Sequence, residues 1–337
     1  MTKAKFYMIK WFPGSPRTGG DRVFMEIYNA IKDIPEVDVR LVEGFESSRD
    51  PNKIKLLLNL IFIHTRKNLY TFKLVKEGYE VYAGSSAGTF EYVQPFPVST
   101  TGTAGKLQKV VATFRELIYK VLQLGINNLR IVIYASQYAQ KNFKIEKKGL
   151  VEEVILPGML SNIPNVNLEN KEDLILTISR ISRGKNLEML GTMLKGVSYQ
   201  HYLIGYCDDN VYLNKLRNKL PKTTIIPNAS EEQKRDLLKK AKILLHAALY
   251  DTAPSVLSEA MAFAAIPIAH KSGGAPEIVP NEFLFDDFHS ANEKINYFLR
   301  NYNPSIAEKL TSISKQFNVE KFRENIRNSI ESYLQNK

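Results

Sequence analysis

The chain has 337 residues, a net charge of +11 and a single cysteine. Its hydrophobic fraction of 44% and charged fraction of 24% exclude a disordered or fibrous protein, and its length exceeds what one hydrophobic core usually supports. The lone Cys207 excludes an intramolecular disulfide and favours a reducing compartment. We therefore expect a globular protein of two domains.

Strand-like runs alternate with helix-like runs in the first half of the chain, a pattern typical of parallel sheets covered by helices. The expected strands are Lys5–Phe12, Val37–Val42, Leu58–His64, Glu80–Ala83, Pro97–Thr100, Arg130–Ala135 and Glu153–Leu156. The expected helices are Arg22–Ile34, Asn68–Glu77, Lys106–Leu124 and Gln137–Phe143. This half of the chain is predicted to form one α/β domain.

A second series of strands follows the polar segment Pro157–Asp173, which we interpret as a linker. A helix is expected from Ser255, because Pro254 stands where a first helical turn tolerates proline. The chain finishes with a charged helix, Val319–Leu334. The expected strands are Leu174–Ile178, Tyr202–Gly205, Thr224–Ile226, Ile243–Ala247 and Ile266–Ala269.

The positive charge is concentrated in the first half. Residues 1–150 carry 23 Lys and Arg against 13 Asp and Glu, a net charge of +10, whereas residues 151–337 carry 23 against 22. Basic residues alternate with a helical apolar stripe over Lys106–Leu124. Two interpretations remain open: the solvated back of a core helix, or a surface that docks on an anionic membrane or an acidic acceptor. No nucleic-acid-binding module is evident, so we expect no nucleic acid partner.

No segment predicts a span across a membrane. The opening residues are too short and too interrupted by lysine for a signal sequence, and the apolar run 56–63 covers less than half of the roughly 20 residues that a span needs. We expect a cytoplasmic protein, with peripheral contact to the inner face of the membrane as an alternative.

Two carboxylates flank the expected helix start at Ser255. Asp251 and Glu259 are separated by seven residues, and the backbone amides of Ser255 and Val256 open the helix between them. Free amides and the positive end of the helix dipole attract phosphate. The arrangement therefore suits an anionic sugar-phosphate ligand.

This stretch resembles the donor-site signature of retaining GT-B glycosyltransferases, especially glycosyltransferase family 4. The similarity covers the acidic pair, the run Glu259-Ala-Met-Ala262, and Gly273-Gly-Ala-Pro-Glu-Ile278. Upstream, Ile178-Ser-Arg180 with Gly184-Lys185-Asn186 resembles the basic pair of that family, and Gly19-Gly20-Asp21 resembles its amino-terminal glycine-rich turn. The resemblance implies an α/β GT-B fold, in which two Rossmann-like domains place parallel sheets on either side of a cleft.

The resemblance also implies a domain plan and an activity. It predicts an acceptor-binding domain at 1–157, a donor-binding domain at 158–318, and a helix at 319–337 that packs back toward the first domain. The implied reaction moves a hexose, with retention, from a UDP- or GDP-linked sugar to a glycan, lipid-linked or other hydroxyl acceptor. The nucleotide sugar is a substrate, and we expect no cofactor and no metal, because no Asp-x-Asp motif follows a strand.

Particular residues take roles in this scheme. Arg180 and Lys185 supply cations for the diphosphate, since arginine offers a planar fork and lysine a point charge. Glu259 is expected to bind the ribose hydroxyls. Asp251 stands where the family usually has glutamate close to the donor sugar, and a plain turn or capping aspartate is the competing interpretation.

Five further residues complete the set of candidates. Gly19 and Gly20 would let the backbone approach the diphosphate, with a helix following from Arg22. Ile226 is a candidate for contact with the nucleotide base. His64 is a candidate sugar or acceptor contact because it ends an expected strand, at the edge of the sheet where ligands bind. Thr101 is another, because it stands near the position where the family commonly places a histidine that this chain lacks.

Two other functions remain open at this point. A degenerate protein that binds a nucleotide sugar or carbohydrate without catalysis would account for Asp251 and the missing histidine. A sugar-nucleotide epimerase of similar fold would rearrange a nucleotide sugar without any acceptor.

Overall fold

The computed structural model describes residues 3–10, 19–43, 69–70, 72–84, 129–142, 148–161, 164, 166–197, 199–207 and 209–336. The chain divides into two compact units, each with its own sheet. The first unit comprises Met1–Ala135, Gln140–Ile155 and Arg323–Lys337, and the second comprises Ser136–Ala139 and Leu156–Phe322.

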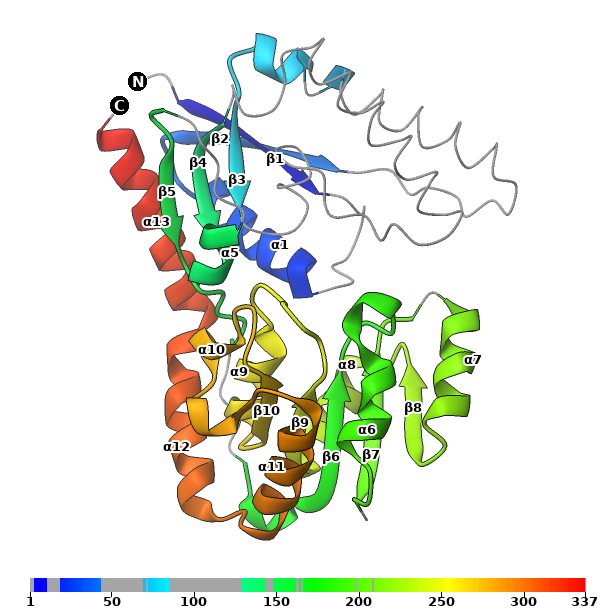
Figure 1. Ribbon diagram of the computed structural model, residues 1–337. Coiled ribbons are helices and arrows are strands. Elements are labelled where there is room, and N and C mark those ends of the chain that lie inside the picture. Colours follow the sequence, from blue (N-terminus) through cyan, green and yellow to red (C-terminus); the bar gives the residue numbers. More distant parts are fainter. Residues whose placement is uncertain are drawn as a thin grey trace. The chain divides into compact units, whose positions relative to one another are not determined.

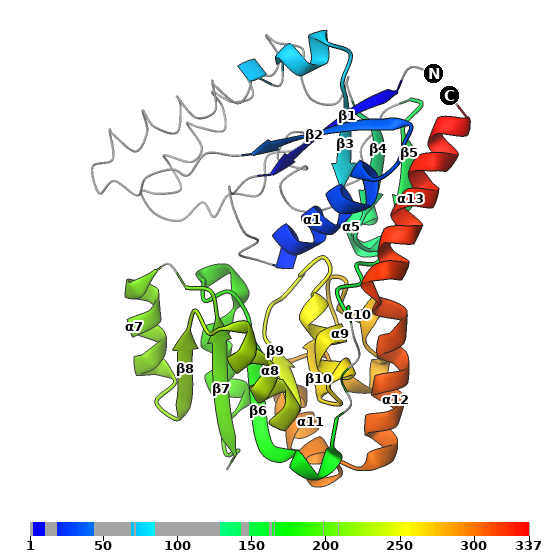
Figure 2. The ribbon, with the colours of Figure 1, turned by 180° about the vertical axis from the view of Figure 1, so that it is seen from behind.

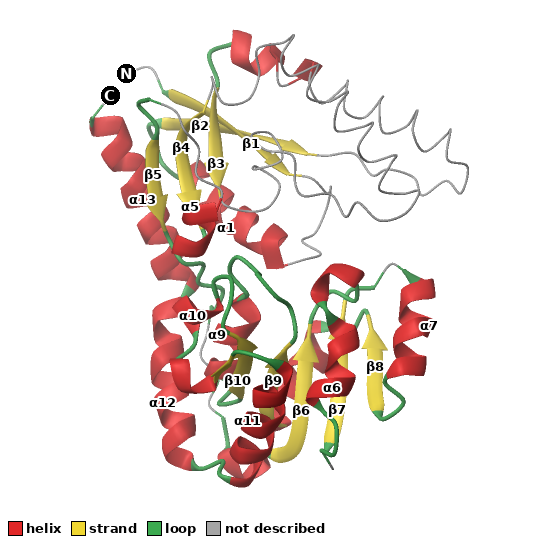
Figure 3. Ribbon diagram, viewed as in Figure 1, coloured by secondary structure: helices red, strands yellow, loops and turns green. Residues whose placement is uncertain are grey.

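The first unit contains a five-stranded parallel sheet in the order β2-β1-β3-β4-β5 (Figure 3). Residues 6–8 of β1 and residues 131–134 of β4 are buried without alternation, as expected for parallel strands covered on both faces. The strands are β1 (Ala4–Lys10), β2 (Val37–Glu43), β3 (Glu80–Gly84), β4 (Leu129–Tyr134) and β5 (Val151–Val154).

Two helices far apart in sequence pack together in this unit. Helix α1 (Gly19–Lys32) follows β1, and the last part of α13 (Val319–Gln335) lies against it. Arg323 Nε donates to Glu26 Oε2 at 2.6 Å, and Arg327 Nε donates to the Ala30 carbonyl at 3.2 Å. The end of the chain is therefore part of the first unit.

The second unit contains a six-stranded parallel sheet in the order β11-β10-β9-β6-β7-β8 (Figure 1). Counted from β6 along the chain, this is the 3-2-1-4-5-6 order of the doubly wound dinucleotide-binding folds. The strands are β6 (Glu172–Ile178), β7 (Gln200–Gly205), β8 (Thr223–Pro227), β9 (Ala241–His246), β10 (Ile266–His270) and β11 (Leu284–Phe285).

Helices cover both faces of this sheet. Helices α6 and α11 lie over one face (Figure 1), and α8 and α9 lie over the other (Figure 2). The helices are α5 (Gln137–Asn142), which begins in this unit, α6 (Leu190–Met193), α7 (Asn210–Lys219), α8 (Glu231–Lys240), α9 (Ser255–Ala262), α10 (Ala275–Ile278), α11 (Phe288–Arg300) and α12 (Pro304–Ser314). The 3-10 turns are η2 (Leu168–Asn170), η3 (Arg183–Lys185), η4 (Leu187–Met189), η5 (Asn281–Phe283) and η6 (Lys315–Phe317).

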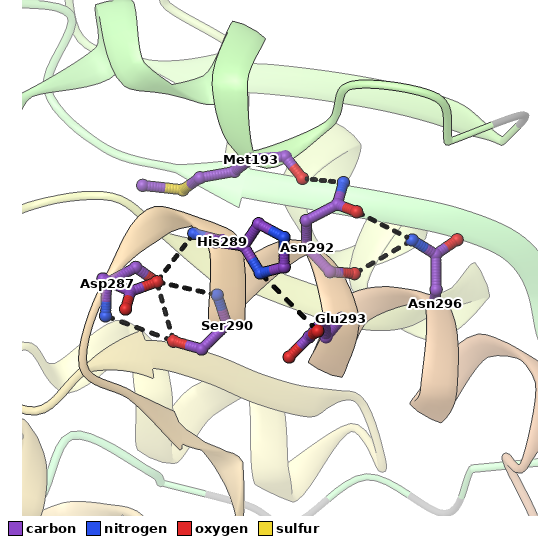
Figure 4. A network of polar contacts seen from close by, with 7 residues as sticks. All are labelled: Met193, Asp287, His289, Ser290, Asn292, Glu293 and Asn296. Atoms are coloured by element: carbon purple, nitrogen blue, oxygen red, sulfur yellow. Dashed lines mark hydrogen bonds and ion pairs between the residues drawn. The ribbon is translucent and has the colours of Figure 1, made fainter.

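Helix α11 is fixed at its start and along its length by polar side chains (Figure 4). The Asp287 carboxylate accepts from the Ser290 amide at 2.8 Å, and the Ser290 hydroxyl accepts in return from the Asp287 amide, which forms a capping box. Asn292 Nδ2 then donates to the carbonyls of Met193 at 2.7 Å and Lys195 at 3.0 Å. These bonds join α11 to the carboxyl end of α6 on the same face of the sheet.

A short segment from the middle of the chain is held in the second unit by one carboxylate. Glu277 in α10 accepts from the backbone amides of Gln137 at 2.8 Å and Tyr138 at 2.9 Å, the first two residues of α5. Two amides that the helix itself leaves without partners are thereby satisfied. We call this interaction the Glu277 clasp.

Most of the predicted strands and helices within the described residues are confirmed, with shifted ends. Helix α1 begins at Gly19, so the Gly-Gly pair forms its first turn and does not precede a helix from Arg22. Strand β5 ends at Val154, two residues before the predicted end. The predicted linker is ordered at its start, where Leu160 pairs with Asn318, and β6 begins before it ends. The predicted elements at 58–64, 97–100 and 106–124 lie outside the described residues.

Candidate functional site

The strand order places a topological switch point between β6 and β9. These two strands are neighbours, with Leu176 opposite Leu244, yet the chain leaves β6 toward β7 and leaves β9 toward β10 on the other side. The loops that follow them therefore turn to opposite faces of the sheet, and ligands of open α/β sheets bind in the gap at such a switch point. Residues 179–187 and 247–254 form the two loops here.

Two of the predicted site residues meet across this gap. Lys185 Nζ donates to Asp251 Oδ2 at 2.5 Å, and the two side chains are 25% and 23% exposed. Asn186 adopts a left-handed conformation, with φ of 55°, and its Nδ2 donates to the Ala247 carbonyl at 3.2 Å. The two loops are thus bonded to each other at two points.

Asp251 is held as a carboxylate. Its burial alone would raise its pKa, but the Lys185 ammonium, His246 and the Arg180 guanidinium act in the other direction, so the pKa of Asp251 lies below its ordinary value. Arg180 is exposed and forms no ion pair with any residue that the structure describes. Because Arg180 lowers the pKa of Asp251, its charge lies near that carboxylate. Because its side chain is exposed, its donors can reach a ligand.

Two glycines fix the backbone that carries Asp251. Gly273 has a φ of 64°, and a Cβ there would lie 2.2 Å from the Asp251 carbonyl oxygen. A Cβ on Gly274 would lie 2.0 Å from the Thr252 carbonyl oxygen, and the Gly274 amide donates to the Asp251 carbonyl at 2.8 Å. Only glycine allows this approach, so the Gly-Gly turn of the sequence motif is a support for the loop at Asp251.

Helix α9 presents backbone donors next to this loop. It begins at Ser255, as predicted, and its N-cap, Pro254, makes no side-chain capping bond. The amides of Ser255 and Val256 therefore lack the side-chain acceptor that usually satisfies a first turn. An anion near such a helix start gains about 0.3–1 kcal/mol from the dipole.

Glu259 lies in the middle of α9 and has a partner that the sequence did not suggest. Its side chain is 9% exposed, and Lys234 Nζ from α8 lies 2.5 Å from its Oε2. One feature of the sequence could have indicated this contact. Lys234 lies in the first turns of a helix, where acidic residues are favoured and a lysine is not.

His246 is a second residue that the sequence analysis missed. It ends β9, is 5% exposed, and its Nε2 lies 3.8 Å from Asp251 Oδ2, which is too long for a hydrogen bond. Burial lowers the pKa of His246 to about 4, so the ring is neutral at neutral pH. Among the described contacts its Nε2 has no hydrogen-bond partner.

The other predicted residues are distributed as follows. Gly19 and Gly20 open α1 in the first unit, and Ile226 is a half-buried residue of β8 opposite Ile204. His64 and Thr101 lie outside the described residues. Within the part of the chain that the structure describes, no three His, Cys, Asp or Glu side chains gather as a metal-binding cluster, and no helix is long and apolar enough to cross a membrane.

Comparison with known proteins decides the family of the second unit. Residues 158–317 match the model of the family described as Glycosyl transferases group 1. These residues belong to the glycosyl transferases group 1 family. Arg180, Lys185, Asp251 and Glu259 all fall within the matched segment.

Similarities to solved structures extend over the whole chain and concern its fold. Sucrose-phosphate synthase from Thermosynechococcus elongatus is 14% identical, with a TM-score of 0.69 over 99% of this chain and 100% of that one. Anabaena Alr3699/HepE in complex with UDP and glucose is also 14% identical, with a TM-score of 0.64 over 98% and 100%. At such identities the likeness establishes the fold alone, and it confirms the GT-B fold expected from the sequence.

One curated protein also matches part of this chain. It is the phosphatidylinositol N-acetylglucosaminyltransferase gpi3 subunit of Schizosaccharomyces pombe, 24% identical over 181 residues. The match covers 48% of this chain and 38% of that protein, so it spans well under half of the relative's length.

Proposed function

We propose that this protein transfers a hexose from a UDP- or GDP-linked sugar to a hydroxyl group of an acceptor, with retention of the anomeric configuration. The supporting observation is the Lys185–Asp251 pair, placed at the switch point of a sheet that matches the glycosyl transferases group 1 model, with the exposed guanidinium of Arg180 near enough to lower the pKa of Asp251. The pair combines a cation for a diphosphate with a carboxylate for a sugar hydroxyl, and these are the two groups on either side of the bond to be broken.

The proposed chemistry rests on stabilising the leaving diphosphate. Breaking the bond to the anomeric carbon leaves negative charge on the β-phosphate, and fixed donors aimed at that charge lower the barrier. Arg180 would bind phosphate oxygens through its planar fork. Lys185 has three donors, so it could keep its bond to Asp251 and still donate to a phosphate. The amides of Ser255 and Val256 would complete the set.

Retention requires no protein base in this scheme. The acceptor hydroxyl attacks on the face that the diphosphate leaves, and a phosphate oxygen of the leaving group takes the proton. Asp251, already ionised, would accept a hydrogen bond from a hydroxyl of the donor sugar and hold the ring in position. We propose that no divalent metal is required, because Arg180, Lys185 and the start of α9 supply the positive charge.

The rest of the donor would follow the same edge of the sheet. Glu259 is proposed to accept bonds from the two ribose hydroxyls, and Ile226 to contact the base. The acceptor is proposed to bind residues 1–157, with Gly19 and Gly20 close to the diphosphate and the helix at 319–337 completing that domain. The charge of +10 in residues 1–150 supports an acidic acceptor or peripheral contact with an anionic membrane from the cytoplasmic side.

A thermal-shift screen against UDP-, GDP-, ADP- and TDP-sugars tests the donor assignment. A ligand at a hundredfold excess over its Kd stabilises the folded protein by about 2.7 kcal/mol, so a selective donor should stand out. The chosen donor is then incubated with a panel of hydroxyl acceptors, and product anomers are assigned by NMR. Rearrangement of the donor without an acceptor would identify an epimerase, and saturable binding without turnover on any acceptor would identify a binding protein.

A further inference from the structure

Lys234 occupies a position that the local rules of helix formation disfavour. It is the fourth residue of α8, directly after the Ser230–Gln233 capping box and behind two acidic residues, Glu231 and Glu232. Cations near the positive end of a helix are unfavourable, whereas acidic residues there are favourable. A lysine at this point therefore requires a reason outside its own helix.

The side chain of Lys234 is turned away from water. It is 14% exposed, although lysine normally extends its ammonium to solvent. Its Nζ lies 2.5 Å from Oε2 of the buried Glu259 and 3.4 Å from Oε2 of Glu231, which is 77% exposed. The stronger contact is thus the one inside the protein, with a carboxylate from another helix.

Such a pair is a poor device for stability alone. Removing two charges from water costs most of what their attraction returns, and a well-packed apolar pair of similar size is often as stable. The two helices are also joined elsewhere. Lys171 Nζ donates to the carbonyls of Leu238 and Ala241 at the end of α8, at 3.1 and 2.7 Å, and to the Phe263 carbonyl at the end of α9, at 2.6 Å.

We propose that Lys234 is a positioning residue that holds the Glu259 side chain oriented for the two ribose hydroxyls of the nucleotide. Lys234 fixes Oε2 from α8, and α8 and α9 lie side by side on one face of the sheet (Figure 2). The ammonium also neutralises Glu259, so a nucleotide with its own negative charge does not approach an uncompensated carboxylate. This inference rests on the proposed function and extends it to a residue outside the donor motif.

The test compares two ligands on one set of variants. The nucleoside diphosphate selected by the wild-type protein and its dideoxy analogue, which lacks both ribose hydroxyls, are titrated calorimetrically. We expect Lys234→Met to lower the affinity for the ribonucleotide by about 10- to 100-fold, which is the range for a lost hydrogen bond to a charged group. Its affinity for the dideoxy analogue should not change. Lys234→Arg should keep most of the preference. Lys239→Met is the control, since Lys239 lies on the same helix in an exposed pair with Asp236.

A second measurement separates positioning from simple helix attachment. Glu259→Gln should lower the affinity for the ribonucleotide as Lys234→Met does, and the double variant should be no worse than Glu259→Gln alone. If Lys234→Met does not fold, as judged by circular dichroism, Lys234→Gln replaces it, because it keeps a hydrogen-bond donor without the charge.

The possible outcomes are distinct. If Lys234→Met loses affinity equally for both ligands, or for neither, the proposed role of Lys234 is overturned. A wild-type protein that binds nucleoside diphosphates with ribose preference, loses it in Glu259→Gln and keeps it in Lys234→Met would overturn this inference alone. A wild-type protein that binds no nucleoside diphosphate would overturn the proposed function, and this inference with it.

Discussion

The support that Gly273 gives to Asp251 leads to a prediction with a matched control. In Gly273→Ala the new methyl group meets two costs: the left-handed backbone at φ 64°, and a carbonyl oxygen of Asp251 only 2.2 Å away. Gly196 has a similar φ of 75°, but nothing lies within 4 Å of a Cβ built there. The difference between the two alanine variants therefore isolates the steric effect on the Asp251 loop.

The magnitudes follow from the geometry. A left-handed alanine costs about 1–2 kcal/mol, and Gly196→Ala should lose only this much. The contact at Gly273 is more than about 1 Å shorter than the normal separation of nonbonded carbon and oxygen, and forced displacement of a packed backbone costs about 1–3 kcal/mol more. A shift of about 1 Å in a positioning group lowers a rate by about a hundredfold, so we expect that loss in Gly273→Ala and none in Gly196→Ala.

Two assays decide the matter. Urea unfolding followed by circular dichroism gives the free energy of unfolding of each variant, and release of nucleoside diphosphate from the sugar donor gives the rate. If both variants lose the same stability and retain the same rate, the Gly273 turn does not position Asp251 and the reasoning is refuted.

Three further predictions concern Arg180, Glu259 and the buried histidines. Arg180→Ala should lower the transfer rate by about 10²–10³-fold with an unchanged unfolding free energy, because the side chain is exposed, and equal activity in both proteins would contradict the diphosphate role. Glu259→Ala should raise the KM for the donor by more than it lowers kcat, and steady-state kinetics with variable donor would show the reverse if Glu259 acted in the transition state alone. Burial lowers the pKa of His246 to about 4 and that of His201 to about 3, below the ordinary 6.5, so the unfolded chain binds more protons than the folded one. The free energy of unfolding should therefore be highest above about pH 6.5 and fall as the pH decreases toward 4, by about 3 kcal/mol for His246 alone. Urea unfolding across this range should show a smaller loss in His246→Leu. A free energy of unfolding that does not change with pH would argue against neutral, buried rings.

Local sequence patterns predicted the sheet of the second unit well. The apolar runs of β6 and β9 are buried on both faces, and such runs are recognisable without any knowledge of their neighbours. The start of α9 at Ser255 also follows from its own residues. The helix at Gly19 was placed three residues late, because a Gly-Gly pair favours a turn by propensity and the structure overrides that preference.

The candidate site was predicted only in part. Lys185 and Asp251 are 66 positions apart in the chain. They were assigned to one site only because both belong to motifs that resemble those of a known family. Lys234 and His246 belong to no such motif. The partner of Lys234 depends on which helices share a face of the sheet, and the neutral state of His246 depends on complete burial, and both are properties of packing that no local pattern encodes.

The Glu277 clasp bears on how far the second unit can be treated as a module. The family match runs from residue 158 to residue 317. The Glu277 carboxylate, however, accepts from the amides of Gln137 and Tyr138, about twenty residues before that match begins. A fragment cut at the family boundaries would leave Glu277 without either partner. A domain exchange in this protein should therefore transfer residues 136–139 together with the matched segment. A hybrid joined once, at the start of that segment, would separate the Glu277 carboxylate from the start of α5, which it caps.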